Sequence, residues 1–171
     1  DVKTGSAREA VSVGSYIAAS AAVYDNTAYV GHYGARLVAV GLQHGVIEWE
    51  YGGGEDGEPF FSTPAVNESM VVAGSRDNMI HAVDRLSGER LWTSMTGGKV
   101  DASPVMNDTR IICGSADGRL SILDSKDGTP ISSFDVGASS PNSVCISGAL
   151  IFFTTEDGMV YAVRSAGEHT Q

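Results

Sequence analysis

The side chains that could catalyse a reaction or bind a metal ion are few and widely spaced in this sequence. The four histidines lack the spacing of a zinc site, and Cys113 and Cys145 lie 32 residues apart with no Cys-x-x-Cys pair. Ser62 and Ser103 have no recognisable histidine and acid to activate them. We therefore expect no catalytic centre and no metal site. We also expect both thiols to be buried and to pack as small apolar groups.

Acidic residues are more numerous candidates for ligand binding. Glu55, Asp56 and Glu58 cluster in a glycine-rich segment, but they match no complete calcium-binding loop, so we expect a solvated acidic loop. Three further aspartates recur every 40 residues, at Asp77, Asp117 and Asp157. This regular placement favours side chains that stabilise turns. Two triplets, beginning at Asn67 and Asn107, fit the glycosylation pattern, but asparagine is also favoured in turns, so the sequence leaves their modification open.

The charge of the chain excludes several classes of partner. The sequence has 171 residues, with 11 Lys and Arg against 21 Asp and Glu, a net charge of −10. Such a chain repels phosphate backbones and anionic lipid surfaces, so we expect no nucleic-acid binding. No window holds the roughly 18 apolar residues of a membrane span. Residues 1–5 lack both an initiator methionine and a signal-peptide pattern, which predicts a chain processed or excised from a longer protein.

An internal repeat organises the whole chain. Residues 61–77 align with residues 101–117 at an offset of 40 without a gap, and Pro, Asn, Gly, Ser and Asp coincide. Further steps of 40 forward and 43 backward extend the match, which gives four units of 40–43 residues. Each unit contains short apolar runs separated by glycine-rich turns, a pattern typical of strands.

The strand pattern predicts the fold. In the second unit, strand A lies near 64–67, B at 70–74, C at 79–83 and D at 89–94. Four strands in 40–45 residues is the size of a propeller blade. We predict an all-β protein, a β-propeller built of four-stranded antiparallel blades. The predicted blades span 14–56, 57–96, 97–136 and 137–166, where the last has only strands A, B and C. Residues 1–13 hold a D strand, and 167–171 form a tail.

Residues 82–92 carry Ala, Asp, Ser, Gly and Trp at fixed offsets. This pattern resembles the tryptophan-docking repeat of the PQQ-like (quinoprotein-type) β-propellers. The first unit keeps the tryptophan, whereas Ser132 replaces it in the third. The resemblance implies that each tryptophan docks between neighbouring blades over an adjacent alanine and glycine. It assigns blade-docking roles to Ala39, Gly45, Trp49, Ala82, Gly88, Trp92 and Gly128.

The resemblance also bears on function. Dehydrogenases of this family use pyrroloquinoline quinone (PQQ) and calcium, and they typically contain adjacent cysteines and converging metal ligands. This chain has neither, so we expect no PQQ, no calcium and no enzyme activity. It is nearer the family's non-catalytic scaffolds, such as the periplasmic lipoprotein that assists outer-membrane β-barrel assembly. The resemblance thus implies a periplasmic or extracellular scaffold for protein–protein interaction. The alternatives are a fragment of a PQQ-dependent dehydrogenase and a purely structural half-ring.

Scaffolds of this kind bind partners through loops on one face of the ring. The longest predicted loop, 51–61, combines glycines, acids and two aromatic residues. The candidate partner-binding residues are Tyr33, Arg36, Glu55, Asp56, Phe60, Phe61 and Arg76.

The number of repeats predicts the assembly. The family usually closes with about twice four blades, and a repeat of standard length implies standard angles between blades. We therefore predict half of an eight-bladed ring, either a homodimer or a piece of a longer propeller. In the dimer, the N-terminal D strand, residues 6–13, completes the partner's open fourth blade.

Overall fold

The computed structural model describes residues 3–6, 10–52, 57–137 and 141–164, which form four antiparallel sheets and no helix. Blade 1 contains β1 (Ala22–Tyr24), β2 (Thr27–His32), β3 (Arg36–Gly41) and β4 (Val46–Gly52). Blade 2 contains β5 (Ala65–Val66), β6 (Met70–Gly74), β7 (Met79–Asp84) and β8 (Arg90–Met95). Blade 3 contains β9 (Val105–Met106), β10 (Arg110–Ser115), β11 (Arg119–Asp124) and β12 (Pro130–Asp135). Blade 4 contains β13 (Pro141–Ser147), β14 (Leu150–Thr155) and β15 (Val160–Arg164).

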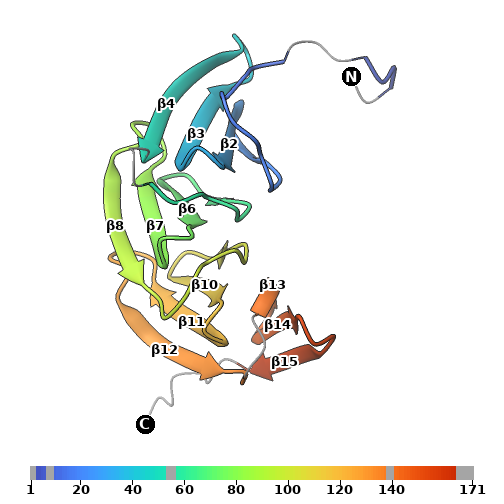
Figure 1. Ribbon diagram of the computed structural model, residues 1–171, viewed down its shortest axis with the longest axis vertical. Helices are drawn as coiled ribbons and strands as arrows, with labels where there is room; N and C mark the ends of the chain where they lie inside the picture. Colours follow the sequence, from blue (N-terminus) through green and yellow to red (C-terminus); the bar gives the residue numbers. More distant parts are fainter. Residues whose placement is uncertain (1–2, 7–9, 53–56, 138–140, 165–171) are drawn as a thin grey trace.

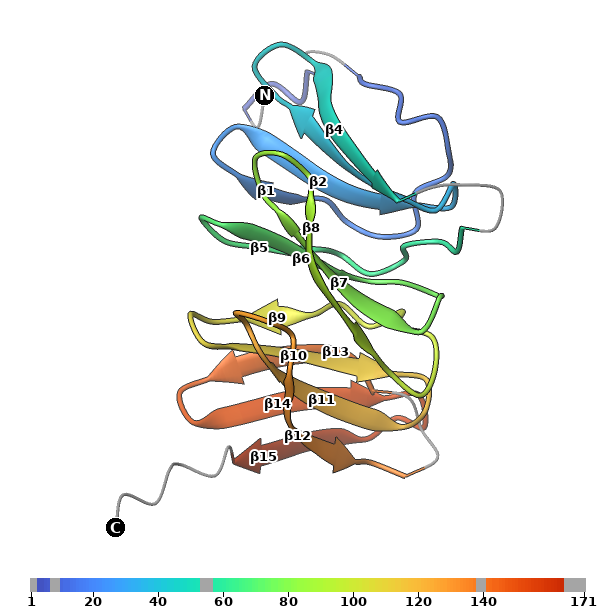
Figure 2. The ribbon, with the colours of Figure 1, turned by 90° about the vertical axis from the view of Figure 1, so that its left-hand side faces the viewer.

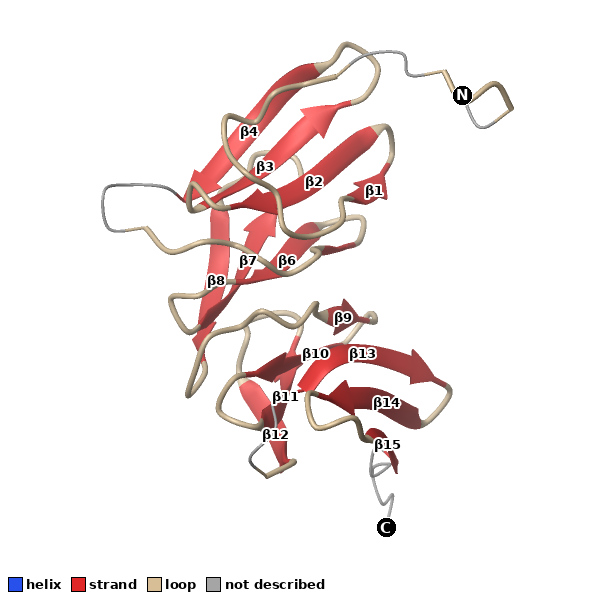
Figure 3. Ribbon diagram, turned by 45° about the vertical axis from the view of Figure 1, so that its right-hand side comes forward, coloured by secondary structure: helices blue, strands red, loops and turns tan. Residues whose placement is uncertain are grey.

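The sheets are arranged as the blades of a propeller, which confirms the predicted fold class. Within each sheet, strands adjacent in sequence pair side by side (Figure 3). The outer strands β4, β8 and β12 follow the convex side of an arc (Figure 1). From the side, the four sheets follow one another along the long axis of the molecule (Figure 2). Among the described residues, no helix is long and apolar enough to span a membrane.

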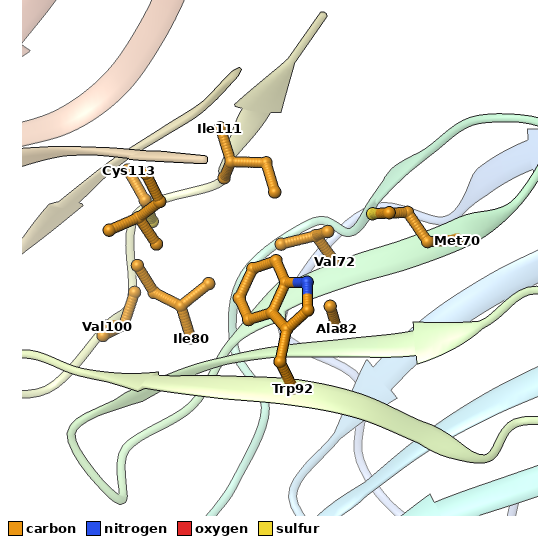
Figure 4. Close-up of a cluster of buried hydrophobic side chains, with 9 residues drawn as sticks. Met70, Val72, Ile80, Ala82, Trp92, Val100, Ile111 and Cys113 are labelled. Atoms are coloured by element: carbon orange, nitrogen blue, oxygen red, sulfur yellow. The ribbon is translucent and has the colours of Figure 1, made fainter. Parts of the chain in front are cut away.

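The core is divided into apolar layers, one at each junction between blades. Alternate side chains of a strand point to opposite faces, so each inner strand contributes to two layers. The blade 1–2 layer packs Tyr29, Leu37 and Ala39 against Val71, Ala73 and Val83. The blade 2–3 layer packs Val72, Ile80 and Ala82 against Ile111, Cys113 and Leu123 (Figure 4). The blade 3–4 layer packs Ile112 and Leu120 against Val144, Ile151 and Phe153.

The recurring polar residues form turns. The side chain of Asp77 accepts a hydrogen bond from the Met79 amide (3.0 Å), and that of Asp117 accepts one from the Arg119 amide (3.1 Å). Asn67 and Asn107 act in the same way in the turns that follow β5 and β9, where each side-chain oxygen accepts two backbone N–H groups. The repeat therefore preserves turn chemistry at these positions.

The N-terminal segment differs from the expected D strand. Residues 3–6 and 10–13 contain no strand, and residues 7–9 lie outside the described part. Val11 and Val13 instead pack against the apolar face of blade 1 that points away from blade 2, formed by Val30, Val38 and Val40. A D strand is defined by its pairing with a C strand, and no strand of a preceding blade lies beside this segment. The tail, 167–171, lies outside the described residues.

Candidate functional site

Three of the predicted partner-binding residues meet at the loops that join the strands of blades 1 and 2. The rings of Tyr33 and Phe61 lie 4.4 Å apart between centroids. The guanidinium carbon of Arg76 lies 4.0 Å above the centre of the Phe61 ring. Tyr16, which sequence reasoning did not single out, adds a third ring 5.3 Å from Tyr33 in an edge-on arrangement. Asp101 completes the group, which we call the aromatic loop surface.

Hydrogen bonds hold the aromatic loop surface in place. The side chain of Arg76 donates two hydrogen bonds to the Asp101 carboxylate, of 2.9 and 2.8 Å. These bonds raise the pKa of Arg76 and fix its guanidinium over Phe61. The backbone N–H of Tyr33 donates to the carbonyl of Tyr16 at 2.9 Å. The surface is therefore organised before any partner arrives.

The aromatic rings remain open to solvent although they contact one another. Tyr16 is 69% exposed and Tyr33 is 49% exposed. A cation over an aromatic face contributes about 0.5–1 kcal/mol at an exposed site. Exposed tyrosine, phenylalanine and arginine side chains are the residue types most enriched at protein–protein interfaces and their hot spots. The arrangement can therefore anchor a partner but contains no group positioned to break a bond.

The remaining predicted site residues do not join this surface. Phe60 is only 3% exposed and packs in the blade 1–2 layer, where its ring lies 5.1 Å from His81. Its inclusion as a contact residue is therefore wrong, because the side chain fills the space above Gly31. Arg36 forms an ion pair with Glu50 on the neighbouring strand. Glu55 and Asp56 lie outside the described residues.

The two tryptophans lie across the first two junctions. The Trp49 indole lies over Gly88 of blade 2, and its N–H donates to the carbonyl of Arg85 at 3.0 Å. Trp92 lies over Gly128 of blade 3, and its N–H donates to the carbonyl of Ser125 at 3.2 Å. Each tryptophan is paired in register with an alanine of the adjacent strand, Ala39 or Ala82. The turn glycines Gly45, Gly88 and Gly128 all have positive φ, between 62° and 73°.

The third junction has a groove at the position of the missing tryptophan. Ser132 occupies the equivalent place on β12, and a groove of about 570 Å³ opens between blades 3 and 4. Apolar side chains such as Leu120, Ile131 and Ile151 line it, together with Arg110 and Arg164. Deeper in the junction, Phe153 and Tyr161 stack with ring centroids 5.0 Å apart.

Titratable side chains lie inside the first junction and are engaged in hydrogen bonds. The two ring nitrogens of His81 contact the Tyr51 hydroxyl and the Asp77 carboxylate, each at 2.9 Å. Burial lowers the pKa of His81, although Asp77 opposes the shift. Among the residues that the structure describes, no group of three or more His, Cys, Asp or Glu side chains could share a metal ion.

The two cysteines differ. Cys113 is buried in the blade 2–3 layer, and burial raises its pKa to about 12. Cys145 is exposed, so the expectation that both thiols are buried is wrong for this one. The reason is its position on the face of blade 4 that points away from blade 3, beside Phe152 and Val160.

A comparison with known families identifies the repeat. The family model described as outer membrane protein assembly factor BamB, a PQQ-like repeat, matches residues 1–138. The chain belongs to this PQQ-like propeller family. No curated protein sequence matches the chain significantly. The family assignment confirms the resemblance that the residues around Trp92 indicated.

Solved structures show the PQQ-like fold at low sequence identity. The computationally designed Ika4 protein aligns with a TM-score of 0.80 and 17% identity, over 93% of this chain and 99% of its own. BamB from Moraxella catarrhalis aligns with a TM-score of 0.76 and 20% identity, over 89% of this chain and 48% of its own. The quinohemoprotein alcohol dehydrogenase from Comamonas testosteroni aligns at 0.71 and 14%, over 82% and 29%. The chain thus spans about half of BamB and under a third of the dehydrogenase.

Proposed function

We propose that this chain is a non-catalytic propeller scaffold that binds a protein partner through the aromatic loop surface. The observation that carries the proposal is the exposed stack of Tyr16, Tyr33 and Phe61 capped by Arg76. Aromatic rings fixed in place lose little conformational entropy on binding, which favours their use as anchors. Membership of the family described as BamB assembly factors supports a role in protein interaction.

The same family description favours a periplasmic or extracellular location, and it favours function without a bound cofactor. The alternative is a fragment of a PQQ-dependent dehydrogenase, which the fold similarity to the alcohol dehydrogenase alone supports. Titration of the purified chain with PQQ and calcium separates the two. The scaffold proposal expects no saturable change in quinone absorbance, whereas stoichiometric binding of the quinone would favour the dehydrogenase fragment.

The partner-binding proposal is tested by affinity capture from an extract of the source cells. The triple variant Tyr33→Ala/Phe61→Ala/Arg76→Ala removes the stack and its cation, and the control Leu86→Ala removes an exposed apolar side chain from a turn of blade 2. Proteins captured by both the parent and the control should be lost with the triple variant, whose circular dichroism should match that of the parent. If the folded triple variant retains every captured protein, the surface is not the binding site.

A further inference from the structure

The face of blade 4 that points away from blade 3 is an inter-blade surface without a neighbouring blade. Ile80 of blade 2 and Leu120 of blade 3 are 0% exposed, because each packs against the blade that follows. Val160, one repeat beyond Leu120, is 73% exposed. Val160 and Phe152 line a shallow pocket of about 220 Å³ together with Cys145. The position that is buried in the preceding repeats is therefore left open here.

The opposite end of the arc contains the complementary element. Val11 falls one repeat before Tyr51 of β4 in the alignment of units. Tyr51 contacts blade 2 at His81, and Val11 likewise contacts blade 1 at the cluster that includes Val38. Residues 10–13 thus lie where the D strand of a preceding blade would pack, yet they pair with no C strand.

Blade 4 offers the edge that this segment lacks. In blades 1, 2 and 3, the third strand pairs on both sides, with the second strand and with the outer strand. In blade 4, β15 pairs with β14, and no described strand pairs with its other edge. The chain therefore has a strand-like segment without an edge at one end and an edge without a strand at the other.

We propose that two copies of this chain exchange these elements, so that residues 10–13 of each copy pair with β15 of the other and close one ring of eight blades. The two elements lie at opposite ends of the arc (Figure 1), which favours pairing between copies over pairing within one. The curvature supports this choice. The designed Ika8 protein aligns with 87% of this chain over only 46% of its own length, so a chain about twice as long contains the same arc.

The repeat also fixes the register of the exchanged strand. Leu37 lies opposite Tyr51, Ile80 opposite Ser94 and Leu120 opposite Phe134. By the same offsets, Val160 of one copy lies opposite Val11 of the other. Directly opposed residues in antiparallel strands have Cα atoms about 4.5–5.5 Å apart, within the range that a disulfide bridges.

Cysteine trapping tests this register. The variant Val11→Cys/Val160→Cys, made in a Cys145→Ser background, should yield a covalent dimer under mild oxidation. The control Val11→Cys/Leu86→Cys, with the second cysteine in a distant turn, should stay monomeric on a non-reducing gel. A disulfide within single chains would show closure of a four-bladed ring, and the absence of any disulfide would show that the ends do not meet. Either result overturns the proposal.

Sedimentation gives an independent readout that does not depend on cysteine chemistry. The parent should sediment at twice 17.8 kDa. Val160→Lys should convert it to a monomer without unfolding, because this side chain is already exposed within one chain. The control Met95→Lys changes an equally exposed apolar residue on β8 and should remain a dimer. A monomeric parent, or a Val160→Lys variant that stays dimeric, contradicts the proposal.

Discussion

The first two junctions of the arc and the third are built on the same strand positions but are finished differently at the outer strand. Trp49 and Trp92 cross the first two junctions and each donates a hydrogen bond to the next blade. At the third, Ser132 leaves a groove, and the stacked rings of Phe153 and Tyr161 lie in the layer beneath. The apolar layer between blades and the tryptophan at its rim are therefore separable. A blade can keep the first while losing the second.

This difference matters for the aromatic loop surface. Tyr33 follows β2 of blade 1, whereas Phe61 and Arg76 flank strands β5 and β6 of blade 2. The surface thus spans the junction that Trp49 crosses. A rigid first junction keeps the rings of the two blades in contact, whereas the third junction has no part in that surface.

Removal of a docked indole should give the largest effect. Trp92→Ala removes a buried ring from the blade 2–3 layer, and we expect a loss of about 3–5 kcal/mol in the free energy of unfolding. Ser132→Ala, at the equivalent position of the third junction, should change it by no more than about 0.5 kcal/mol. Urea unfolding of both variants measures the contrast. Equal losses at the two positions would show that the tryptophan adds nothing special.

The glycine beneath the indole should give the next largest effect. Gly128 has a φ of 73°, and an added Cβ would lie 2.4 Å from a ring carbon of Trp92. Gly128→Ala should therefore cost about 1–2 kcal/mol for the left-handed backbone and about 1–3 kcal/mol for overpacking.

Gly148→Ala serves as the matched control. Gly148 has a φ of 58° and no atom within 4 Å of an added Cβ, so only the backbone cost should appear. The difference in urea midpoint between the two variants isolates the contact with the indole. If the two alanines destabilise the protein equally, the close approach of glycine and tryptophan is not important for stability.

Acid should weaken the first junction selectively, with the smallest effect of the three. Burial holds the pKa of His81 below 6.5, so below about pH 6.5 the unfolded chain binds a proton that the folded chain does not. Stability should thus be fully present above pH 6.5 and fall as the pH drops toward 5. Buried His32 has a lowered pKa too and adds to the same trend.

The variant His81→Gln separates the contribution of the junction. Urea midpoints between pH 7.5 and 5 should decline less steeply for His81→Gln than for the parent, whereas His44→Gln, at an exposed turn position, should follow the parent. This range lies above the pH at which Asp84 titrates, since hydrogen bonds from Ser87 keep the pKa of Asp84 below 3.8. A parent whose stability rises on acidification would contradict the assigned direction.

The gapless 40-residue repeat was sufficient to predict the fold and its strands, because propeller blades pack through the same positions each time. In blade 2, strands predicted at 70–74 and 79–83 appear as β6 (Met70–Gly74) and β7 (Met79–Asp84). Loop contacts were harder to predict. The repeat places Phe60 and Phe61 side by side in sequence, but only the fold shows that one ring is buried and the other meets Arg76.

Two features lay outside what the repeat can reveal. Tyr16 belongs to the segment before β1, which has no strand assignment, so periodicity gave no reason to pair it with Tyr33. Its position among several exposed aromatic residues was the only available signal. The exposure of Cys145 depends on whether a blade follows blade 4, a property of the assembly rather than of the local sequence.

Hydrogen exchange most directly tests whether the tryptophan-docked junctions make blades 1 and 2 a rigid support for the aromatic loop surface. The measurement uses the Val160→Lys variant, so that contact between copies cannot protect blade 4. Backbone amides of β2 and β6 should exchange at least about tenfold more slowly than those of β14, which corresponds to about 1.4 kcal/mol in opening free energy. Uniform exchange across the blades, or slower exchange in blade 4, would contradict a support held by Trp49 and Trp92.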